Sequence, residues 1–259
     1  MSETKKSLGQ HWLHDKAVLR SIVEAGDINS EDTVLEIGPG RGTLTKVLLD
    51  TGTTVQALEF DQDLIPFLKK EFSSNENFSV EEGDIRKFDY GSLPKKYKII
   101  ANIPYYLTSN LIRAISETAN PPVIAVLLIQ KEVAERICAG PGHMGILSIT
   151  AQFYFECSLG IVVPASLFTP PPKVDSQVVI LEKRDEKLFD VEERDFFKFI
   201  KAGFSEKRKT LRNSLSGGLH LPKNKVEGLL QEAGLDQNAR AQELSMQQWH
   251  ELYLLYAAQ

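Results

Sequence analysis

The sequence predicts an α/β fold in which a doubly wound, largely parallel sheet is followed by a small all-helical domain. Three observations predict it. Five strand-like segments alternate with helical ones, two further strands follow with only a loop between them, and the strand pattern then stops. We therefore expect a first domain at residues 1–186 that contains the sheet, and a helical second domain at residues 187–259.

The expected strands are short segments rich in β-branched and other apolar residues. They lie at residues 33–38, 54–60, 78–84, 98–103, 123–130, 158–164 and 176–183. Helical apolar spacing is found between them, for example at residues 43–51 and 63–72. Because a loop without a helix joins the last two strands, we expect these two to pair antiparallel at the end of the sheet.

Four helical segments are expected after residue 186, at residues 191–204, 207–215, 223–234 and 246–257. The chain has a formal net charge of -5, yet its residues 198–212 carry six basic side chains and one acid, Glu206. A charged helix face is usually just solvated, but one sign on an acidic protein favours contact with phosphates. The basic residues are Lys198, Lys201, Lys207, Arg208, Lys209 and Arg212.

The composition is that of an ordinary globular protein, with 259 residues that are 42% hydrophobic and 25% charged. No apolar signal region is visible at the N-terminus, and the longest apolar run, residues 123–129, is too short to cross a membrane. We expect a cytoplasmic location and no contact with membranes. Cys138 and Cys157 form no CxxC pair, and His11 and His14 lack a third ligand, so we expect no metal.

Glycine or polar residues stand at the C-terminal ends of four consecutive expected strands. Gly38 and Gly40 follow the first strand, Glu59 closes the second, Asp84 the third and Asn102 the fourth. Ligands bind at this edge of open parallel sheets, although each residue alone could be a turn or a helix cap. The glycines are spaced G-x-G-x-G, which differs from the nicotinamide fingerprint G-x-G-x-x-G.

The order and spacing of "EIGPGRGTLT", "LEFD", "EGDIRKF" and "NIPYY" resemble those of the S-adenosylmethionine-dependent adenine methyltransferases, which have a Rossmann-like seven-stranded sheet. Four further segments are similar to the KsgA/RsmA-type dimethyltransferases of small-subunit ribosomal RNA: "KKSLGQHWLHD", "IQKEVAERI", "LFTPPPKVDSQVV" and "FSEKRKTLRNSL". The resemblance covers nearly the whole chain. It implies dimethylation of the N6 amines of two adjacent adenosines in the 3'-terminal hairpin loop of 16S rRNA, during small-subunit biogenesis.

The resemblance also implies how S-adenosylmethionine is held. The glycine loop lies against the methionine part, Glu59 holds the ribose and Asp84 meets the adenine. The segment "GQHWL" packs over the cofactor where the family usually has "GQNFL", so that His11 replaces an amide side chain. The expected cofactor-binding residues are His11, Leu13, Gly38, Gly40, Glu59, Asp84 and Asn102.

Methylation of an exocyclic amine requires acceptors for both of its N–H groups, because these favour a tetrahedral nitrogen in the transition state. Asn102 supplies a side-chain oxygen, and by resemblance the carbonyl of Pro104, or of Ile103 beside it, is the second acceptor. Tyr105 would hold the extracted base against its ring. The alternative is a strand-ending turn with tyrosines in the core; for Tyr106 we expect only a structural role.

Three consecutive prolines at residues 170–172 stiffen the loop that begins at Phe168. In the resembling family this phenylalanine lines the other face of the target base, and Lys173 lies where RNA phosphate could be met. The alternative is a structural role, in which the loop is a rigid surface connection and Phe168 packs in the core. By resemblance the helical domain helps to dock the RNA, with Lys207, Arg208, Lys209 and Arg212 as the expected contacts.

Three other functions are compatible with parts of the pattern. A large-subunit rRNA methyltransferase of the macrolide-resistance type would share "NIPY" and the glycine loop, but "PPPKVDS" and "KRKTLRNSL" favour the small subunit. A DNA adenine methyltransferase would need an additional recognition domain. A ribosome assembly factor could keep the fold mainly for binding. We expect a monomer that acts on small-subunit rRNA in a pre-ribosomal particle.

Overall fold

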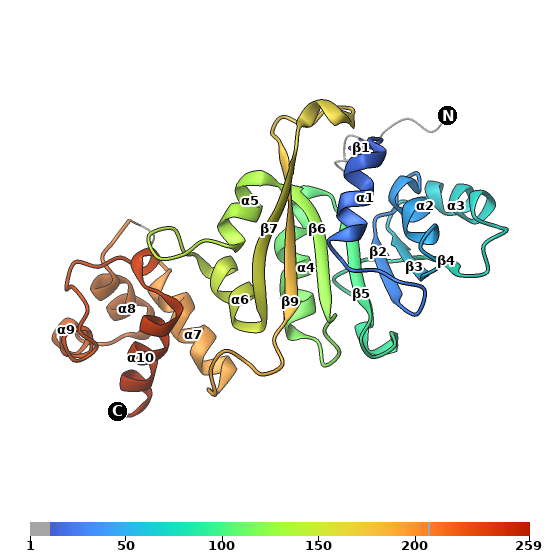
Figure 1. Cartoon of the computed structure of the whole chain (residues 1–259). Coiled ribbons are helices and arrows are strands. Elements are labelled where there is room, and N and C mark those ends of the chain that lie inside the picture. The colour runs from blue at the N-terminus through green and yellow to red at the C-terminus, as the bar shows by residue number, and fades with distance from the viewer. Residues whose placement is uncertain (1–10, 207) are drawn as a thin grey trace. The chain divides into compact units, whose positions relative to one another are not determined.

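A computed structural model describes residues 11–206 and 208–259 and contains the expected seven-stranded sheet (Figure 1). Its strands are ordered β4-β3-β2-β5-β6-β9-β7. The bounds are β2 Thr33–Ile37, β3 Thr54–Glu59, β4 Phe78–Glu82, β5 Lys98–Asn102, β6 Ile124–Gln130, β7 Phe155–Val163 and β9 Ser176–Lys183. The seven-stranded prediction is confirmed, with each strand within three residues of its expected start.

The sheet is parallel from β4 to β6 and antiparallel beyond it. β2 pairs parallel with β3 and β5, while β3 pairs with β4 and β5 with β6 in the same sense. β9 runs antiparallel between β6 and β7, which confirms the expected antiparallel pair. All parallel strands therefore present their C-terminal ends at one edge.

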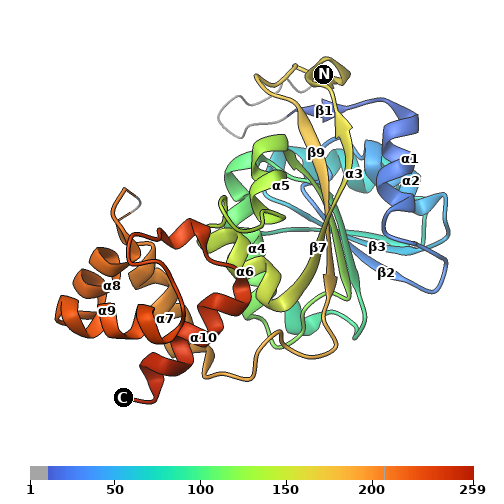
Figure 2. The same ribbon diagram turned by 60° about the vertical axis from the view of Figure 1, so that its left-hand side comes forward.

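Helices cover the sheet on both sides, as the alternating pattern predicts. α1 (Lys16–Glu24) and α2 (Thr43–Leu49) lie on one side, and α4 (Thr108–Glu117) lies on the other (Figures 1 and 2). α3 (Ile65–Glu71) follows β3, with Pro66 in its first turn, where a missing N–H has no cost. The α1 side chains Leu19 and Ile22 join the buried cluster that contains Val34 and Val126, so the core lies between this helix and the sheet.

A second, two-stranded sheet was not expected from the sequence. β1 (Trp12–Leu13) pairs antiparallel with β8 (Phe168–Thr169), so that Trp12 faces Thr169 and Leu13 faces Phe168. β8 follows the short η5 turn (Ala165–Leu167) in the loop between β7 and β9 (Figure 2). The pairing fixes the segment before α1 to a loop more than 150 residues later in the chain.

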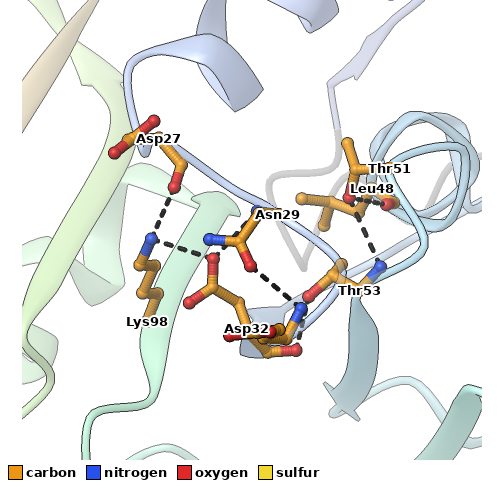
Figure 3. Close-up of polar contacts among 8 residues, drawn as sticks. Asp27, Asn29, Asp32, Leu48, Thr51, Thr53 and Lys98 are labelled. Carbon is orange, nitrogen blue, oxygen red and sulfur yellow. Dashed lines mark hydrogen bonds and ion pairs between the residues drawn. The ribbon is translucent and has the colours of Figure 1, made fainter.

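A polar network closes the opposite, N-terminal edge of the sheet (Figure 3). Lys98, the first residue of β5, donates from Nζ to the backbone carbonyl of Asp27 at 2.6 Å and to Asp32 Oδ2 at 2.9 Å. The same Asp32 oxygen accepts from the backbone N–H of Asn29 at 2.9 Å. Both charged side chains are mostly buried, with 13% and 16% exposed, so this ion pair connects β5 with the loop before β2.

The chain divides into two compact units. The first holds residues 1–135 and 154–185, and the second holds residues 136–153 and 186–259. Residues 136–153, which we expected in the first domain, therefore group with the helical region. The predicted domain boundary at residue 186 stays a prediction.

The second unit contains α6 (Ile146–Tyr154, all but its last residue) and the helices α7 Glu193–Gly203, α8 Leu211–Leu219, α9 Lys223–Glu232 and α10 Met246–Ala257. Aromatic rings form its centre: Phe196 lies 5.6 Å from Phe153 and 5.3 Å from Tyr253 between ring centroids. α8 begins at Leu211 and not at residue 207, because Thr210 has an extended backbone and the Leu211 N–H is donated to Ala239.

Candidate cofactor-binding and active site

A pocket opens at the C-terminal edge of the parallel strands, within the first unit. It contains every expected cofactor ligand, and also Pro104 and Tyr105 of the expected reacting group. Phe168 is not among the described residues that line it. Of the expected residues, the pocket brings together His11, Leu13, Gly38, Gly40, Glu59, Asp84, Asn102, Pro104 and Tyr105.

The glycine loop between β2 and α2 has a backbone that side chains rarely adopt. Gly38, Gly40 and Gly42 all have positive φ, at 65°, 59° and 73°. A Cβ on Gly40 would come within 3.3 Å of the indole nitrogen of Trp12, and one on Gly42 within 2.5 Å of the Phe72 ring. The loop is therefore closely packed, and α2 begins directly after it at Thr43.

Glu59 is buried at the end of β3, and its carboxylate faces the glycine loop. Its Oε2 accepts the N–H of Gly40 at 3.0 Å and its Oε1 accepts the N–H of Asp61 at 2.8 Å. Burial raises the pKa of Glu59, while these two hydrogen bonds act in the opposite direction. A carboxylate offers about four acceptor positions, so acceptor capacity remains for hydroxyl groups of a ligand.

Asp84 lies two residues beyond β4 and is held by Arg86. Nε of Arg86 lies 2.9 Å from Oδ1 and 3.0 Å from Oδ2, Nη2 also contacts Oδ2, and the Arg86 N–H donates to Oδ1. The hydrogen bond from the guanidinium holds the pKa of Asp84 below its usual value. Arg86 thus uses most of the acceptor positions of this carboxylate, and a ligand amine would have to share them.

Asn102 ends β5 with its side chain in the pocket. Nδ2 donates to the backbone carbonyl of His11 at 3.4 Å, which orients the amide and leaves its oxygen as an acceptor toward a ligand. The neighbouring carbonyl of Pro104 accepts the N–H of Leu107 at 3.0 Å in the short helix η4 (Tyr105–Leu107). A second lone pair on that oxygen stays available.

His11 and Tyr105 form one wall of the pocket. Their rings are stacked, with centroids 6.0 Å apart and planes 23° from parallel. Nδ1 of His11 donates to the carbonyl of Pro170 at 2.7 Å, because a carbonyl can only accept. The hydroxyl of Tyr105 lies 2.8 Å from Ser176 Oγ on β9, and burial raises the pKa of this tyrosine. Both rings are therefore held by the loop and strand that follow β8.

The residues that line the pocket but were missed in the sequence include Trp12, Glu36, Phe60, Arg86 and Tyr106. Glu36 had a readable signal, since an acid within the buried strand β2 is unusual. Trp12 lies beneath Arg41, whose guanidinium carbon is 4.2 Å from the centroid of the ring. Nothing in the sequence shows that Phe60 and Tyr106 are exposed, at 54% and 57%.

Phe168 is buried in the core of the first unit, with 3% of its surface exposed. This burial agrees with the alternative in which Phe168 packs in the core. Contact between Phe168 and a base stays a prediction. Lys173 is exposed in the same loop. Arg208 and Lys209 are exposed in the turn before α8, whereas Arg212 Nη1 is paired with Glu227 Oε1 at 2.6 Å.

Lys207 lies outside the described residues. The described residues contain no group of three or more potential metal ligands. Within the same residues, every helix is too short or too polar to cross a membrane.

The pocket fits S-adenosylmethionine on its own geometry. Glycines without a Cβ would allow the methionine part to approach closely, Glu59 would have acceptor positions left for ribose hydroxyls, and Asp84 would be the acceptor for an adenine amine. With the parallel strands and the antiparallel β9, these features define a Rossmann-like, S-adenosylmethionine-dependent methyltransferase.

The sequence model of the family described as ribosomal RNA adenine dimethylase matches residues 1–258. The chain belongs to this family.

Relatives with curated names cover almost the whole chain. "Ribosomal RNA small subunit methyltransferase A" of Dehalococcoides mccartyi (strain CBDB1) is 42% identical over 259 residues, which is 98% of this chain and 89% of that protein. The protein of the same name from Nostoc sp. is 39% identical, with 97% of each chain covered. The KsgA/RsmA-type resemblance is confirmed.

Two solved structures are similar over nearly their full length. A dimethyladenosine transferase from Plasmodium falciparum has a TM-score of 0.82 and 30% identity, with 96% of this chain and 98% of that chain covered. The 23S rRNA methyltransferase ErmE has a TM-score of 0.76 and 27% identity, with 94% and 98% covered. The helical second unit is thus included in both matches.

Proposed function

We propose that this enzyme dimethylates the N6 amines of two adjacent adenosines in the 3'-terminal hairpin loop of small-subunit rRNA, with S-adenosylmethionine as methyl donor. The observation that carries the proposal is the orientation of Asn102. Its Nδ2 is held by the carbonyl of His11, so that its side-chain oxygen remains to accept an amine hydrogen in the pocket.

The residues of the chain position the amine. Asn102 Oδ1 and the carbonyl of Pro104 would accept the two N–H groups, which favours a tetrahedral nitrogen whose lone pair can attack. The sulfonium of the bound cofactor supplies an electrophilic methyl group. With the amine held by Asn102 and Pro104, the N–C bond would form as the S–C bond of the cofactor breaks, and the nitrogen would then release its proton to water. No general base is needed for this step.

Tyr105 would form the platform for the base, since its hydroxyl is fixed by Ser176 and its ring is half-buried. Stacking on an aromatic ring compensates for the loss of stacking when a base leaves its strand. The first unit would therefore supply both the chemistry and the base pocket. The exposed Arg208 and Lys209 of the second unit would contact RNA phosphates.

The relatives favour the small subunit over the large subunit. The curated relatives carry the small-subunit name at about 40% identity, whereas the large-subunit enzyme ErmE is 27% identical. Action on a pre-ribosomal particle, a monomeric state and a cytoplasmic location belong to the same proposal. A role mainly in assembly is not favoured, because Glu59, Asp84 and Asn102 meet in one pocket.

The proposal is tested with a labelled methyl donor and ribosomal subunits from a strain that lacks the modification. We expect label in the RNA of immature small subunits, at N6 of two adjacent adenosines after digestion and mass spectrometry. Large subunits from the same strain are the matched control. Label in large-subunit RNA alone would overturn the proposal.

A further inference from the structure

Tyr106 is an exposed aromatic residue on the rim of the pocket. It is the middle residue of η4, lines the pocket and has 57% of its surface exposed. From the sequence alone we expect only a structural role for it. Tyr105, directly before it, has its hydroxyl anchored to Ser176, so the two consecutive rings differ in burial and contacts.

A cationic side chain shares this rim. Arg86 lines the same pocket and has 58% of its side chain exposed, with its guanidinium bound to Asp84. Proteins bind single-stranded nucleic acid with exposed aromatic rings that stack on bases and with cations that contact the backbone, and both kinds of side chain line this pocket.

We propose that Tyr106 stacks on the nucleotide next to the target adenosine, outside the pocket, while Tyr105 holds the target base inside it. This inference rests on the proposed function. When the target base leaves the strand, its neighbour loses a stacking partner, and an exposed aromatic ring replaces that partner. Because the two target adenosines are adjacent, Tyr106 would hold one of them while the other reacts.

Tyr106 follows the expected amine acceptors directly in the chain. Asp84 follows β4, whereas Tyr106 follows β5 and the Asn102–Pro104 segment that would grip the amine. Phe60, the other exposed aromatic residue of the pocket, follows Glu59 on the cofactor side. Tyr106 thus belongs to the substrate side of the pocket.

The experiment compares Tyr106→Ala and Tyr106→Phe with the wild type in two assays. Methyl transfer to immature small subunits gives kcat and KM, and calorimetry with S-adenosylhomocysteine gives the Kd of the cofactor site. Phe67→Ala is the matched control, because Phe67 is also an exposed aromatic residue, at 43%, but lies on α3 and outside the lining of the pocket.

For Tyr106→Ala we expect KM for the subunit to rise on the order of 10-fold or more, with kcat and the S-adenosylhomocysteine Kd within about 2-fold of wild type. Tyr106→Phe keeps the ring and should behave like wild type, as should Phe67→Ala. A direct readout is an RNA hairpin with 2-aminopurine beside the target adenosine. Its fluorescence should be quenched by the wild type and much less by Tyr106→Ala.

Two results would overturn the inference alone. One is a wild type that methylates small subunits together with a Tyr106→Ala variant of unchanged KM and unchanged quenching. The other is a Tyr106→Ala variant whose S-adenosylhomocysteine Kd rises while KM for RNA stays constant, since the ring would then contact the cofactor. A wild type that binds S-adenosylhomocysteine but labels no small-subunit RNA overturns the proposed function, and this inference with it.

Discussion

The hydroxyl of Thr45 on α2 donates a hydrogen bond of 2.6 Å to Oε2 of Glu36 on β2, and both side chains are almost completely buried. Burial raises the pKa of Glu36 to about 8, and the nearby Glu59 acts in the same direction, whereas the bond from Thr45 lowers it. The folded protein therefore carries a neutral carboxyl group beside the glycine loop at neutral pH.

The unfolding free energy of Glu36→Gln should exceed that of the wild type by a margin that grows as the pH rises. The pKa of Glu36 in the unfolded chain is near 4.5, so between that pH and about 8 only the unfolded state is ionised. The wild-type contribution is thus complete below pH 4.5 and is lost through pH 8, by up to ~1.4 kcal/mol per pH unit. Glutamine removes this slope.

Urea unfolding of both proteins at pH 5, 6, 7 and 8 measures the difference in unfolding free energy. It should grow in favour of Glu36→Gln with increasing pH. Parallel stability curves for wild type and Glu36→Gln would contradict a raised pKa.

Lys98→Met should lower the unfolding free energy by roughly 1–3 kcal/mol, because it leaves the mostly buried Asp32 without its cation and the Asp27 carbonyl without its donor. The exposed pair of Arg113 and Glu117 on α4 gives the control, since Arg113→Ala should change stability by less than ~0.5 kcal/mol. Chemical denaturation measures both. Equal effects of the two substitutions would show that the Lys98 network contributes no more than a surface pair.

Asn102→Ala should lower kcat on the order of 100-fold or more, because one of two acceptors for the amine is lost in the transition state. The Kd for S-adenosylhomocysteine should stay within a few-fold of wild type. Single-turnover methyl transfer and calorimetry measure the two quantities separately. A parallel loss of rate and cofactor affinity would identify Asn102 as mainly a cofactor ligand.

Phe168→Leu separates packing from base contact. Leucine keeps most of the apolar volume in the core, so we expect a loss of stability below ~1.5 kcal/mol. If Phe168 moves to contact the target base, methyl transfer should still fall several-fold, because leucine has no aromatic face. Thermal unfolding and kcat give the comparison, and a normal rate would leave Phe168 as a core residue only.

Replacing Arg208 and Lys209 together by Gln should weaken RNA binding and flatten its salt dependence. The loss of two phosphate contacts should reduce the steepness of the plot of log binding constant against log salt concentration by about 1.4–1.8. The same change at Lys223 and Lys225, exposed on α9, removes equal charge from the same unit and is the control. Filter binding across a salt series measures both slopes. Identical slopes would mean that only net charge matters.

The strand pattern allowed most of the fold to be predicted, because parallel strands buried on both faces read as short apolar runs. The same reasoning found Gly38, Glu59, Asp84 and Asn102, since residues that end such strands must meet at one edge. The pairing of β1 with β8 could not be predicted in this way. Each of these strands has only two residues, and the local sequence of β1 does not indicate a partner so far along the chain.

Side-chain environments were harder to predict than positions. Adjacent tyrosines in "NIPYY" have the same composition signal, yet Tyr105 bonds to Ser176 whereas Tyr106 faces solvent. Arg212 reads as one more cation of the basic segment, but Glu227 on the next helix pairs with it. Such differences depend on neighbours in the tertiary structure, and the periodicity of the sequence carries no information about these neighbours.

Two side chains of the pocket are hydrogen-bonded to residues much later in the chain, so the pocket can be completed only late in translation. His11 and Tyr105 can acquire their hydrogen bonds to Pro170 and Ser176 only after the ribosome has synthesised the proline loop and β9. β7 likewise has no neighbour in the sheet until β9 is inserted between it and β6. A nascent chain that already carries the glycine loop and "NIPYY" therefore still lacks the supports of its reacting end, and becomes a competent enzyme late in its own synthesis.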